Sequence, residues 1–276
     1  MREGREKCVV VAGVGLIGGS IAAAVRTDSP ECSVIGVGRS AERLQAAQDA
    51  GLITGWTSEI SAATIPRGSL GVVCLPVNRV AETALALLRA GCGAVTDVGS
   101  TKAAICRQLA GETLFVGAHP IAGSEQAGFE HADEALFRGR VCVVCPGAAD
   151  SDVVFRVEQF WRALGLTLRR LSADEHDQIL ALTSHLPHVL AAVAAGVVTD
   201  EQLEFTGTGF RDTTRIAAGS AEVWTSILMA NAGACVEAIV QAEQLLGRFR
   251  LALEHGDAEL LSVLWSVSAE RRRKLG

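Results

Sequence analysis

The sequence lacks the features that mark three common classes of protein. It contains no uninterrupted run of about 18 apolar residues, so we expect no membrane span. Basic residues are not in excess, and the net charge of -6 gives no reason to expect nucleic acid as a partner. Glu3 and Glu6 precede the first apolar run and a glycine-rich turn interrupts it, which is not typical of a secretory signal. We therefore expect a globular protein located in the cytoplasm.

Cysteine is plentiful, but its spacing does not indicate a disulfide or metal framework. Eight cysteines are spread along the chain, and Cys142 and Cys145 have the spacing of a redox or zinc pair. Because 141–145 is an expected strand, these two side chains point to opposite faces and chelate poorly. No second pair follows. We expect buried apolar thiols and no metal site.

The first part of the chain alternates short apolar runs with helical segments, which predicts a parallel sheet with helices on both faces. The expected strands cover 7–12, 33–37, 70–75, 94–97, 114–117, 141–145 and 167–171. Later segments rich in Ala, Leu and Val predict helices over 174–198, 222–254 and 257–274. We predict an α/β domain over 1–171 and an all-helical domain over 172–276.

A glycine-rich turn joins the first expected strand to the helix that follows it. Gly13 suits the tight turn, Gly15 lets the backbone approach a pyrophosphate, and Gly18 allows the helix to pack closely on the strand. Leu16 and Ile17 begin the helix, whose amino end attracts phosphate charge. This context predicts a Rossmann-type dinucleotide site, and a glycine turn that binds no ligand is the alternative.

The end of the second expected strand bears on the choice of cofactor. An NAD site usually carries Asp or Glu there for the ribose 2′-hydroxyl, but this sequence has Arg39 and Ser40, with Arg43 one helical turn further. Arginine can pair with a 2′-phosphate, which favours NADP. The alternative is that Arg39 is a solvated loop residue that stacks on adenine, which leaves NAD acceptable.

Further candidate residues follow strand ends, where ligands bind in open α/β sheets. Leu75 and Pro76 come after one strand, Ser100 after the next and His119 after a later one. Histidine suits proton transfer near neutral pH. The alternatives are that Ser100 only caps the helix expected at 101–109 and that His119 is a packed loop histidine.

The helical half contains a histidine and two arginines in unusual settings. His185 lies two residues before Pro187, which should bend the helix and loosen its backbone hydrogen bonds. Arg211 and Arg215 lie in a Gly/Thr-rich stretch, and arginine binds a carboxylate in a two-pronged way, which suits a small organic acid. Taken alone, each of these residues is more often structural than functional.

Several segments taken together resemble the marker motifs of the prephenate/arogenate dehydrogenase family. They are Gly-Val-Gly-Leu-Ile-Gly-Gly-Ser, Thr-Asp-Val-Gly-Ser-Thr-Lys, Gly-Ala-His-Pro-Ile-Ala-Gly-Ser-Glu, Ser-His-Leu-Pro-His and Gly-Phe-Arg-Asp-Thr-Thr-Arg-Ile-Ala. They occur in the order found in the family and span residues 13–217. The resemblance covers nearly the whole chain, and the shared order argues against chance.

The resemblance implies a Rossmann-type domain, a helical domain that forms a homodimer, and an NAD(P)-dependent oxidation. Its substrate would be prephenate or arogenate, which is oxidised at the 4-hydroxyl carbon and decarboxylated. His119 would accept the hydrogen of the ring hydroxyl, and Ser100 would hydrogen-bond both this histidine and the substrate. His185 and Arg215 would hold the substrate, with Arg215 anchoring a carboxylate. Two further pocket positions are matched by Ser124 and Trp224.

Some features depart from the family pattern. Arg211 stands where relatives often have lysine, so a positive charge is kept, and Thr208 stands where glycine is common. Asp177 falls in a family motif, and we expect it to be structural or dimer-related. We expect neither a fused mutase segment nor a regulatory module of the ACT type, so any feedback by tyrosine would act at the active site.

Two other functions stay open. A dehydrogenase for another small carboxylic acid, of the β-hydroxyacid type, would use a lysine in the helical domain, but the lysines are Lys7, Lys102 and Lys274. A non-catalytic NADP sensor would keep the glycine turn without needing the histidines and the arginine described above. The sequence also leaves open whether prephenate or arogenate is preferred.

Overall fold

The computed structural model describes residues 6–123 and 126–275, which form one mixed sheet followed by a helical half. The strands are β1 (Cys8–Ala12), β2 (Ser33–Val37), β3 (Gly55–Thr57), β4 (Leu70–Val73), β5 (Ala94–Asp97), β6 (Phe115–Pro120), β7 (Val141–Cys145) and β8 (Thr167–Arg170). Their spatial order is β3-β2-β1-β4-β5-β6-β7-β8, and only the β6–β7 pair is antiparallel among these described strands. The strand order reverses between β1 and β4, the switch point at which dinucleotides bind in such sheets.

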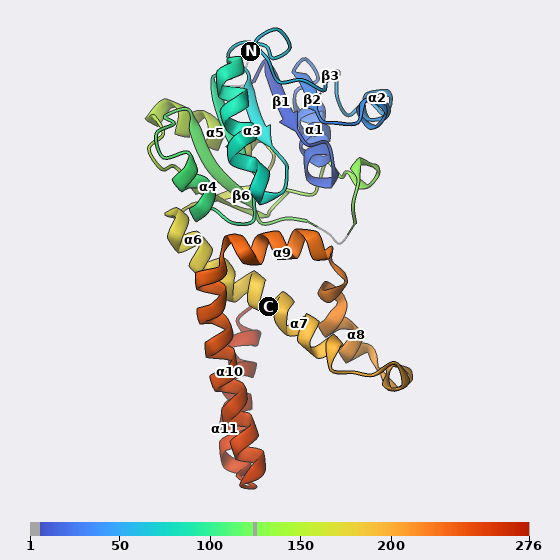
Figure 1. Ribbon diagram of the computed structural model, residues 1–276, viewed down its shortest axis with the longest axis vertical. Coiled ribbons are helices and arrows are strands. Elements are labelled where there is room, and N and C mark those ends of the chain that lie inside the picture. Colours follow the sequence, from blue (N-terminus) through green and yellow to red (C-terminus); the bar gives the residue numbers. More distant parts are fainter. Residues whose placement is uncertain (1–5, 124–125, 276) are drawn as a thin grey trace.

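Helices cover both faces of the sheet (Figure 1). One face carries α1 (Leu16–Asp28), α2 (Ala41–Asp49) and α5 (Ser151–Ala163), and the other carries α3 (Val77–Ala90) and α4 (Ala103–Gln108). In β1, Val9 and Val11 belong to the core of the first face, whereas Val10 and Ala12 belong to that of the second. Because both faces are covered, β1 is apolar at successive positions instead of alternating.

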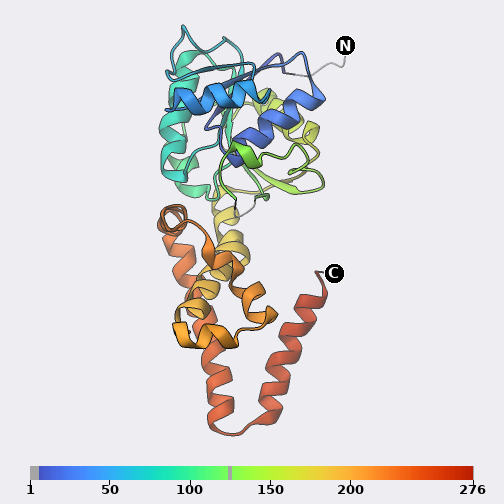
Figure 2. The same cartoon turned by 90° about the vertical axis from the view of Figure 1, so that its right-hand side faces the viewer.

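The helical half begins with one long helix that leaves the sheet. It consists of α6 (Ala173–Leu180), a π-helical turn η2 (Ala181–His185) and α7 (Leu186–Gly196). The chain continues through η3 (Asp200–Phe205), α8 (Thr208–Thr214), η4 (Arg215–Ala218), α9 (Ala221–Ala230), α10 (Ala232–Glu254) and α11 (Ala258–Arg273). Helix α9 runs below the sheet beside α3, and α10 and α11 form a hairpin that projects away from the sheet (Figure 2).

The fold class predicted from the sequence is confirmed, and several element bounds are corrected. The expected single helix over 222–254 is two helices, α9 and α10, which meet at Asn231 with a bend of 96°. The short edge strand β3 was missed, since three residues give little periodicity. Pro187 falls at the start of α7, directly after the π-helical turn, in agreement with the loosened backbone expected there.

Strand β6 also differs from the prediction, in a way that affects His119. Its pairing with β5 stops at Val116, but antiparallel pairing with β7 continues it to Pro120. His119 therefore lies inside a strand that projects beyond β5, opposite Val143, and does not follow a strand end.

The helical half exposes much apolar surface. The continuous helix Ala173–Gly196 is long and apolar enough to cross a membrane by length and composition, which the sequence interpretation did not anticipate, and only 22% of its apolar window is buried. One such helix is weak evidence for a membrane protein. Exposed apolar side chains here include Val193, Val197, Leu246, Leu253 and Trp265. Many exposed apolar side chains on the helices of one half are typical of an interaction surface.

Candidate active site

The glycine turn forms a bare backbone cradle at the amino end of α1. Gly13 has a φ of 100°, a conformation that favours glycine, and a Cβ there would collide with the Cys74 carbonyl on β4. A Cβ at Gly18 would collide with the Gly13 carbonyl. Gly15 faces open space, and α1 begins at Leu16 with neither a side-chain cap nor an acidic residue in its first turn. This cradle fits the pyrophosphate of a nicotinamide dinucleotide.

Three more of the predicted cofactor residues lie beside the cradle. Ile17 is in the first turn of α1 and packs against the core of that face. Leu75 and Pro76 leave β4 next to the turn, and the Leu75 side chain lies against Gly13. The carboxyl ends of β1 and β4 therefore bring together the predicted cofactor residues of two separate segments.

The residues expected at the adenosine end follow β2. Ser40 caps α2, since its Oγ accepts a hydrogen bond from the Arg43 backbone N–H at 3.3 Å. Arg39 is exposed and makes no ion pair or hydrogen bond through its side chain within the described residues. Arg43 forms an ion pair with Glu130, with 3.6 Å between Nη2 and Oε2. The two arginines therefore differ: Arg39 is available to an anion, whereas Arg43 is shared with a carboxylate.

A buried ion pair fixes the backbone in front of His119. Asp97, the last residue of β5, pairs with Lys102, and neither side chain is exposed. The Asp97 carboxylate also accepts hydrogen bonds from the backbone N–H of Ala118 at 3.1 Å and of Gly99 at 2.8 Å. The backbone N–H of Ala118 has no partner on β5, because the pairing of β5 with β6 ends at Val116. The Asp97 carboxylate accepts the hydrogen bond of this N–H instead.

His119 belongs to a chain of three side chains that links the sheet to α6. Its Nδ1 lies 2.9 Å from Nε2 of His176, and Nδ1 of His176 lies 2.7 Å from Oδ1 of Asp177. Asp177 also accepts hydrogen bonds from the backbone N–H of Lys102 at 2.7 Å and of Ala103 at 2.9 Å. Asp177 therefore caps α4 across the two halves of the molecule. The alternative that Ser100 only caps this helix is wrong, because α4 begins at Ala103, two residues later than expected, with Lys102 at the N-cap position.

The hydrogen-bond pattern assigns the protons of this relay. Because the Asp177 carboxylate only accepts, Nδ1 of His176 donates to it, and in this tautomer Nε2 of His176 accepts from Nδ1 of His119. Nε2 of His119 then carries a lone pair. Burial is the main cause that lowers the pKa of His119 well below its usual value, and the positive charge of Lys102 acts in the same direction. The ring is therefore neutral at neutral pH and can accept a proton.

Asp177 is held in its ionised form. Burial alone would raise its pKa, but hydrogen bonds from His176 and from the backbone N–H groups of Lys102 and Ala103 outweigh burial and lower it. An ionised Asp177 keeps the His176 and His119 rings in the tautomers described above. The relay thus orients His119 in the manner of a carboxylate behind a catalytic histidine.

A second group of side chains comes from the π-helical turn, α9 and α10. Nδ1 of His185 lies 3.2 Å from Nδ2 of Asn231 and 3.5 Å from Sγ of Cys235. Because an amide nitrogen donates, Nδ1 accepts and Nε2 carries the proton. No described residue forms a hydrogen bond of good geometry with this buried Nε2, although the Ser100 backbone lies near the ring. Burial lowers the pKa of His185 to about 4, against the opposing influence of Asp177 and the Ser100 backbone. A buried donor of this kind fits an oxygen of an organic acid.

Trp224 on α9 forms a wall of the same region. Its ring stacks on His188 with 3.6 Å between centroids, and it lies edge-on to His185 at 6.4 Å. Nδ1 of His188 donates to the Ser184 carbonyl at 2.8 Å, so that Nε2 of a neutral His188 ring is an acceptor. Gly219 makes room for the indole, since a Cβ there would lie 2.6 Å from its Nε1.

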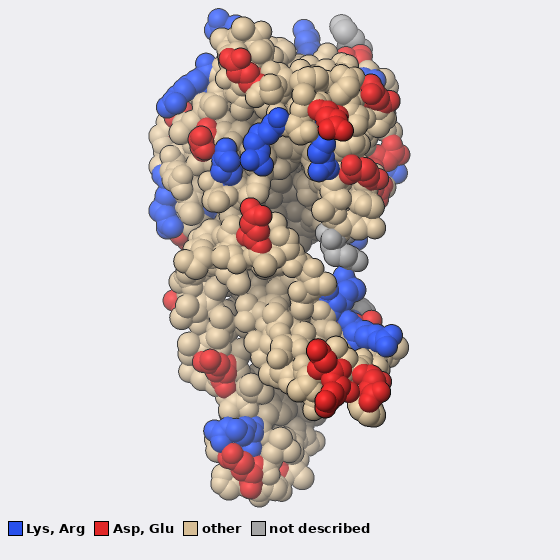
Figure 3. Space-filling model, turned by 45° about the vertical axis from the view of Figure 1, so that its right-hand side comes forward, with Lys and Arg blue, Asp and Glu red and all other residues tan. Residues whose placement is uncertain are grey.

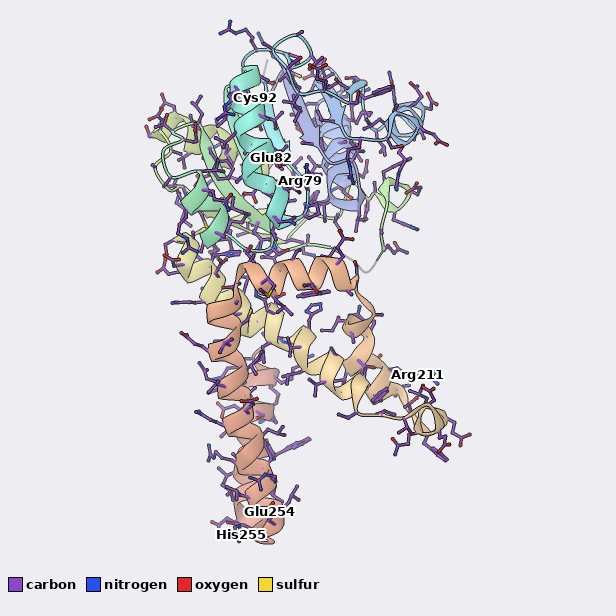
Figure 4. The ribbon with its side chains drawn as sticks, in the orientation of Figure 1. Arg79, Glu82, Cys92, Arg211, Glu254 and His255 are labelled. Atoms are coloured by element: carbon purple, nitrogen blue, oxygen red, sulfur yellow. The ribbon has the colours of Figure 1, made fainter. Side chains whose placement is uncertain are left out.

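The remaining predicted residues lie around these two groups. Ser100 is half-buried between β5 and α4, with its backbone close to His185. Arg215 begins η4 and is near enough to His188 to help lower the pKa of that ring. Arg211 lies on α8, which is distant from the sheet (Figure 4). Ser124 lies outside the described residues. The surface is hollowed between the sheet and the helical half (Figure 3).

Three functional candidates were missed by sequence reasoning, and the role of a fourth was only partly foreseen. His176 is adjacent to Asp177, but nothing in their local pattern shows that the pair faces His119 on another element. Asn231 was placed inside an unbroken helix, so its position at a bend was not foreseen. His188 stands in a motif that was quoted, but only His185 was chosen from it. The fourth, Asp177, was given a structural role that its cap on α4 supports, beside its place in the relay.

Comparison with protein families gives two matches that together cover most of the chain. Residues 21–169 match the family model described as the prephenate dehydrogenase nucleotide-binding domain. Residues 172–265 match the model described as the prephenate dehydrogenase dimerization domain.

Individual relatives agree with these matches. A prephenate dehydrogenase of Bacillus subtilis is 30% identical over 96% of this chain and 75% of its own length. A cyclohexadienyl dehydrogenase of Zymomonas mobilis is 28% identical over 98% of this chain and 96% of its own. Among solved structures, Aquifex aeolicus prephenate dehydrogenase with hydroxyphenyl propionate and NAD+ is 28% identical, covers 99% of both chains and has a TM-score of 0.90. Synechocystis arogenate dehydrogenase is 25% identical, covers 97% of this chain and 99% of its own, and has a TM-score of 0.80.

Proposed function

Because the chain belongs to the prephenate dehydrogenase family, we propose that it oxidises prephenate, arogenate or both, in the pathway to tyrosine. The observation that carries the proposal is the relay behind His119, which leaves Nε2 of a neutral imidazole free to accept a proton. His119 lies at the carboxyl edge of the sheet, on the strand two places from β4, whose end borders the glycine cradle.

His119 would take the proton of the ring hydroxyl while the hydrogen on the same ring carbon leaves with its electron pair. When bound in the cradle, the nicotinamide ring supplies the acceptor for that hydride. The carbon–oxygen bond becomes a carbonyl, and loss of the ring carboxylate as CO2 returns an electron pair to the ring. The phenolate formed in this way takes the proton back from His119, so the base ends the reaction as it began.

The relay would make this proton transfer easier. As His119 gains a proton, its Nδ1–H remains bonded to His176, and the positive charge is stabilised toward the ionised Asp177. The position of Asp177 in the relay is fixed by the cap on α4, because two backbone N–H groups donate to its carboxylate. Movement of α6 relative to the sheet would therefore carry His176 and Asp177 away from His119 and remove the hydrogen bond that orients the base.

Several side chains would bind the substrate. The Nε2–H of His185 is a buried donor for a substrate oxygen, and Trp224 with His188 offers an aromatic wall for the ring. Arg215 would anchor a carboxylate, and Ser100 would hydrogen-bond the substrate hydroxyl and His119. Ser124 is proposed as a pocket residue from the family motif alone.

The cofactor is a nicotinamide dinucleotide, and we propose NADP in preference to NAD. The absence of a carboxylate at the end of β2 and the exposed Arg39 support this choice. Arg43 supports it less, because Glu130 shares its charge. The cradle residues proposed to hold the pyrophosphate are Gly13, Gly15, Leu16, Ile17 and Gly18.

We also propose a cytoplasmic homodimer with its domain boundary between residues 171 and 172. A second copy would cover the exposed apolar side chains of α7, α10 and α11, in keeping with the matched dimerization domain. This arrangement also gives the apolar helix Ala173–Gly196 a place inside a protein interface.

The decisive experiment is a kinetic matrix on the purified protein. Prephenate and arogenate are each tested with NAD and with NADP, following reduced cofactor by its near-ultraviolet absorbance. Turnover in any combination supports the proposal, and the best combination gives the substrate and cofactor preference. If all four combinations are silent while NADP still binds, the chain is a sensor or acts on another acid, and the catalytic role of His119 is wrong.

A further inference from the structure

The glycine motif contains two residues that the pyrophosphate cradle does not use, Gly19 and Ser20. A Cβ at Gly19 would lie 3.2 Å from Cβ of Phe129 and 3.1 Å from Cβ of Ala132. The buried Ser20 hydroxyl accepts a hydrogen bond from the Asp133 backbone N–H at 2.9 Å. These two residues therefore dock the segment 128–133, which contains η1 (Phe129–His131), onto the cofactor helix α1.

The docked segment reaches across to the arginine expected to read the cofactor. Glu130 pairs with Arg43 at 3.6 Å, and the Arg43 guanidinium lies 5.9 Å from the centroid of the Phe129 ring. Gly128 has a φ of 100°, and a Cβ there would overlap the Glu130 carboxylate and approach Arg43 Nη2 to 3.4 Å. Arg43 is therefore held by Gly128, Phe129 and Glu130, which all belong to the connection between β6 and β7.

We propose that Glu130 is a cofactor-discriminating residue that competes with the 2′-phosphate of NADP for Arg43. This rests on the proposed binding of a nicotinamide dinucleotide at the cradle. With NAD, the Arg43–Glu130 pair persists, and Arg39 alone is left at the ribose. With NADP, the phosphate dianion takes Arg39 and Arg43 together, and Glu130 loses its partner close to a group of like charge. Glu130 thereby weakens a preference for NADP that the two arginines would otherwise set.

The expected effect is moderate because both side chains of the pair are more than half exposed, at 58% and 56%. Exposed ion pairs contribute little, and one charge near another in water changes binding modestly. We expect Glu130→Gln to tighten NADP binding about threefold to tenfold and to change NAD binding less than about twofold. Because neither Glu130 nor Arg43 belongs to the relay, the effect is read in the dissociation constants of the two cofactors.

The test is a set of dissociation constants for NADP+ and NAD+, measured by titration calorimetry on the full chain. The variants are E130Q, R43Q and the double variant, with E82Q as the matched control. Glu82 pairs with Arg79 on α3 at 3.4 Å, is exposed, and loses the same charge when substituted (Figure 4). Thermal unfolding of each variant confirms that it is folded before its binding is interpreted.

The proposal requires that E130Q tightens NADP binding selectively, that E82Q does not, and that E130Q has no such effect in the R43Q background. Equal effects on the two cofactors, or a gain that survives in R43Q, would overturn it. A binding readout separates this result from the proposed activity. A protein that shows the selective effect but oxidises neither prephenate nor arogenate supports the role of Glu130 and contradicts only the proposed function.

Discussion

The cofactor end and the substrate end of the site are built in different ways. The cradle comes from one continuous segment between β1 and α1, with β2 and β4 contributing their ends. The relay and the buried histidine pocket join β6, α6, the π-helical turn and the α9–α10 bend, which are far apart in the sequence. The first kind of site is visible in a motif, whereas the second depends on how two halves of the chain meet.

The largest expected effect tests the base at the centre of the relay. His119→Asn keeps a polar side chain of similar size but removes the nitrogen that accepts the proton. We expect kcat to fall about 10³-fold, within the range for loss of a general base, while dissociation constants for NAD and NADP stay within about twofold. Single-turnover kinetics and calorimetric binding check the two parts. Retained turnover would assign proton transfer to another group.

Asp177→Asn tests whether the far end of the relay sets the state of His119. An amide keeps one oxygen for the α4 cap but removes the charge that fixes the two rings, so we expect kcat to fall about 10²-fold with little change in cofactor binding. His176→Asn should have a similar effect.

The two changes should not add. In a double-mutant cycle, a relay predicts that the second substitution costs much less than it does alone. Fully additive losses would show that the two residues act separately, and loss of cofactor binding would indicate a merely structural role.

The contrast between the two ends also explains what the sequence could predict. Gly13 is required by its positive φ and Gly18 by the nearby Gly13 carbonyl, while Gly15 leaves open space for a ligand, so their spacing is enough to identify the cradle. His176 is constrained by His119, which lies on a strand that an antiparallel partner extends beyond its expected end. Asn231 reaches the site only because α10 turns by 96° from α9, and helical periodicity on both sides of the bend conceals the break.

A third test concerns acid stability and again separates the two ends. The pKa of His119 and that of His185 are both lowered in the folded chain, the latter to about 4. As pH falls below about 6.5, these histidines take up protons in the unfolded chain but not in the folded chain. The free energy of unfolding therefore decreases between about pH 6.5 and pH 4. Above about pH 6.5 both histidines are neutral in the folded and the unfolded chain, so they do not change the free energy of unfolding with pH.

His185→Gln should reduce the loss of unfolding free energy between about pH 6.5 and pH 4 by up to about 3 kcal/mol. Thermal unfolding from pH 4 to 8 measures the slope, with His255→Gln as the control, since His255 lies exposed at the far end of the α10–α11 hairpin (Figure 4). If the stability of the two variants depends on pH to the same extent, His185 is not the cause of the acid destabilisation.

The smallest expected effect asks whether Ser40 is a cofactor residue or only a helix cap. Ser40→Ala removes the hydroxyl that accepts from the Arg43 N–H, so α2 should lose about 1 kcal/mol, seen as a fall in Tm of about 2–4 °C. Ser40→Asp keeps a good cap and therefore the Tm, but it places a carboxylate at the end of β2, where NAD sites carry one. Calorimetry should then show weaker NADP binding with little change for NAD. If both cofactors bind to Ser40→Asp as they do to the unchanged chain, the 2′-phosphate does not approach the end of β2, and Ser40 acts only as the cap of α2.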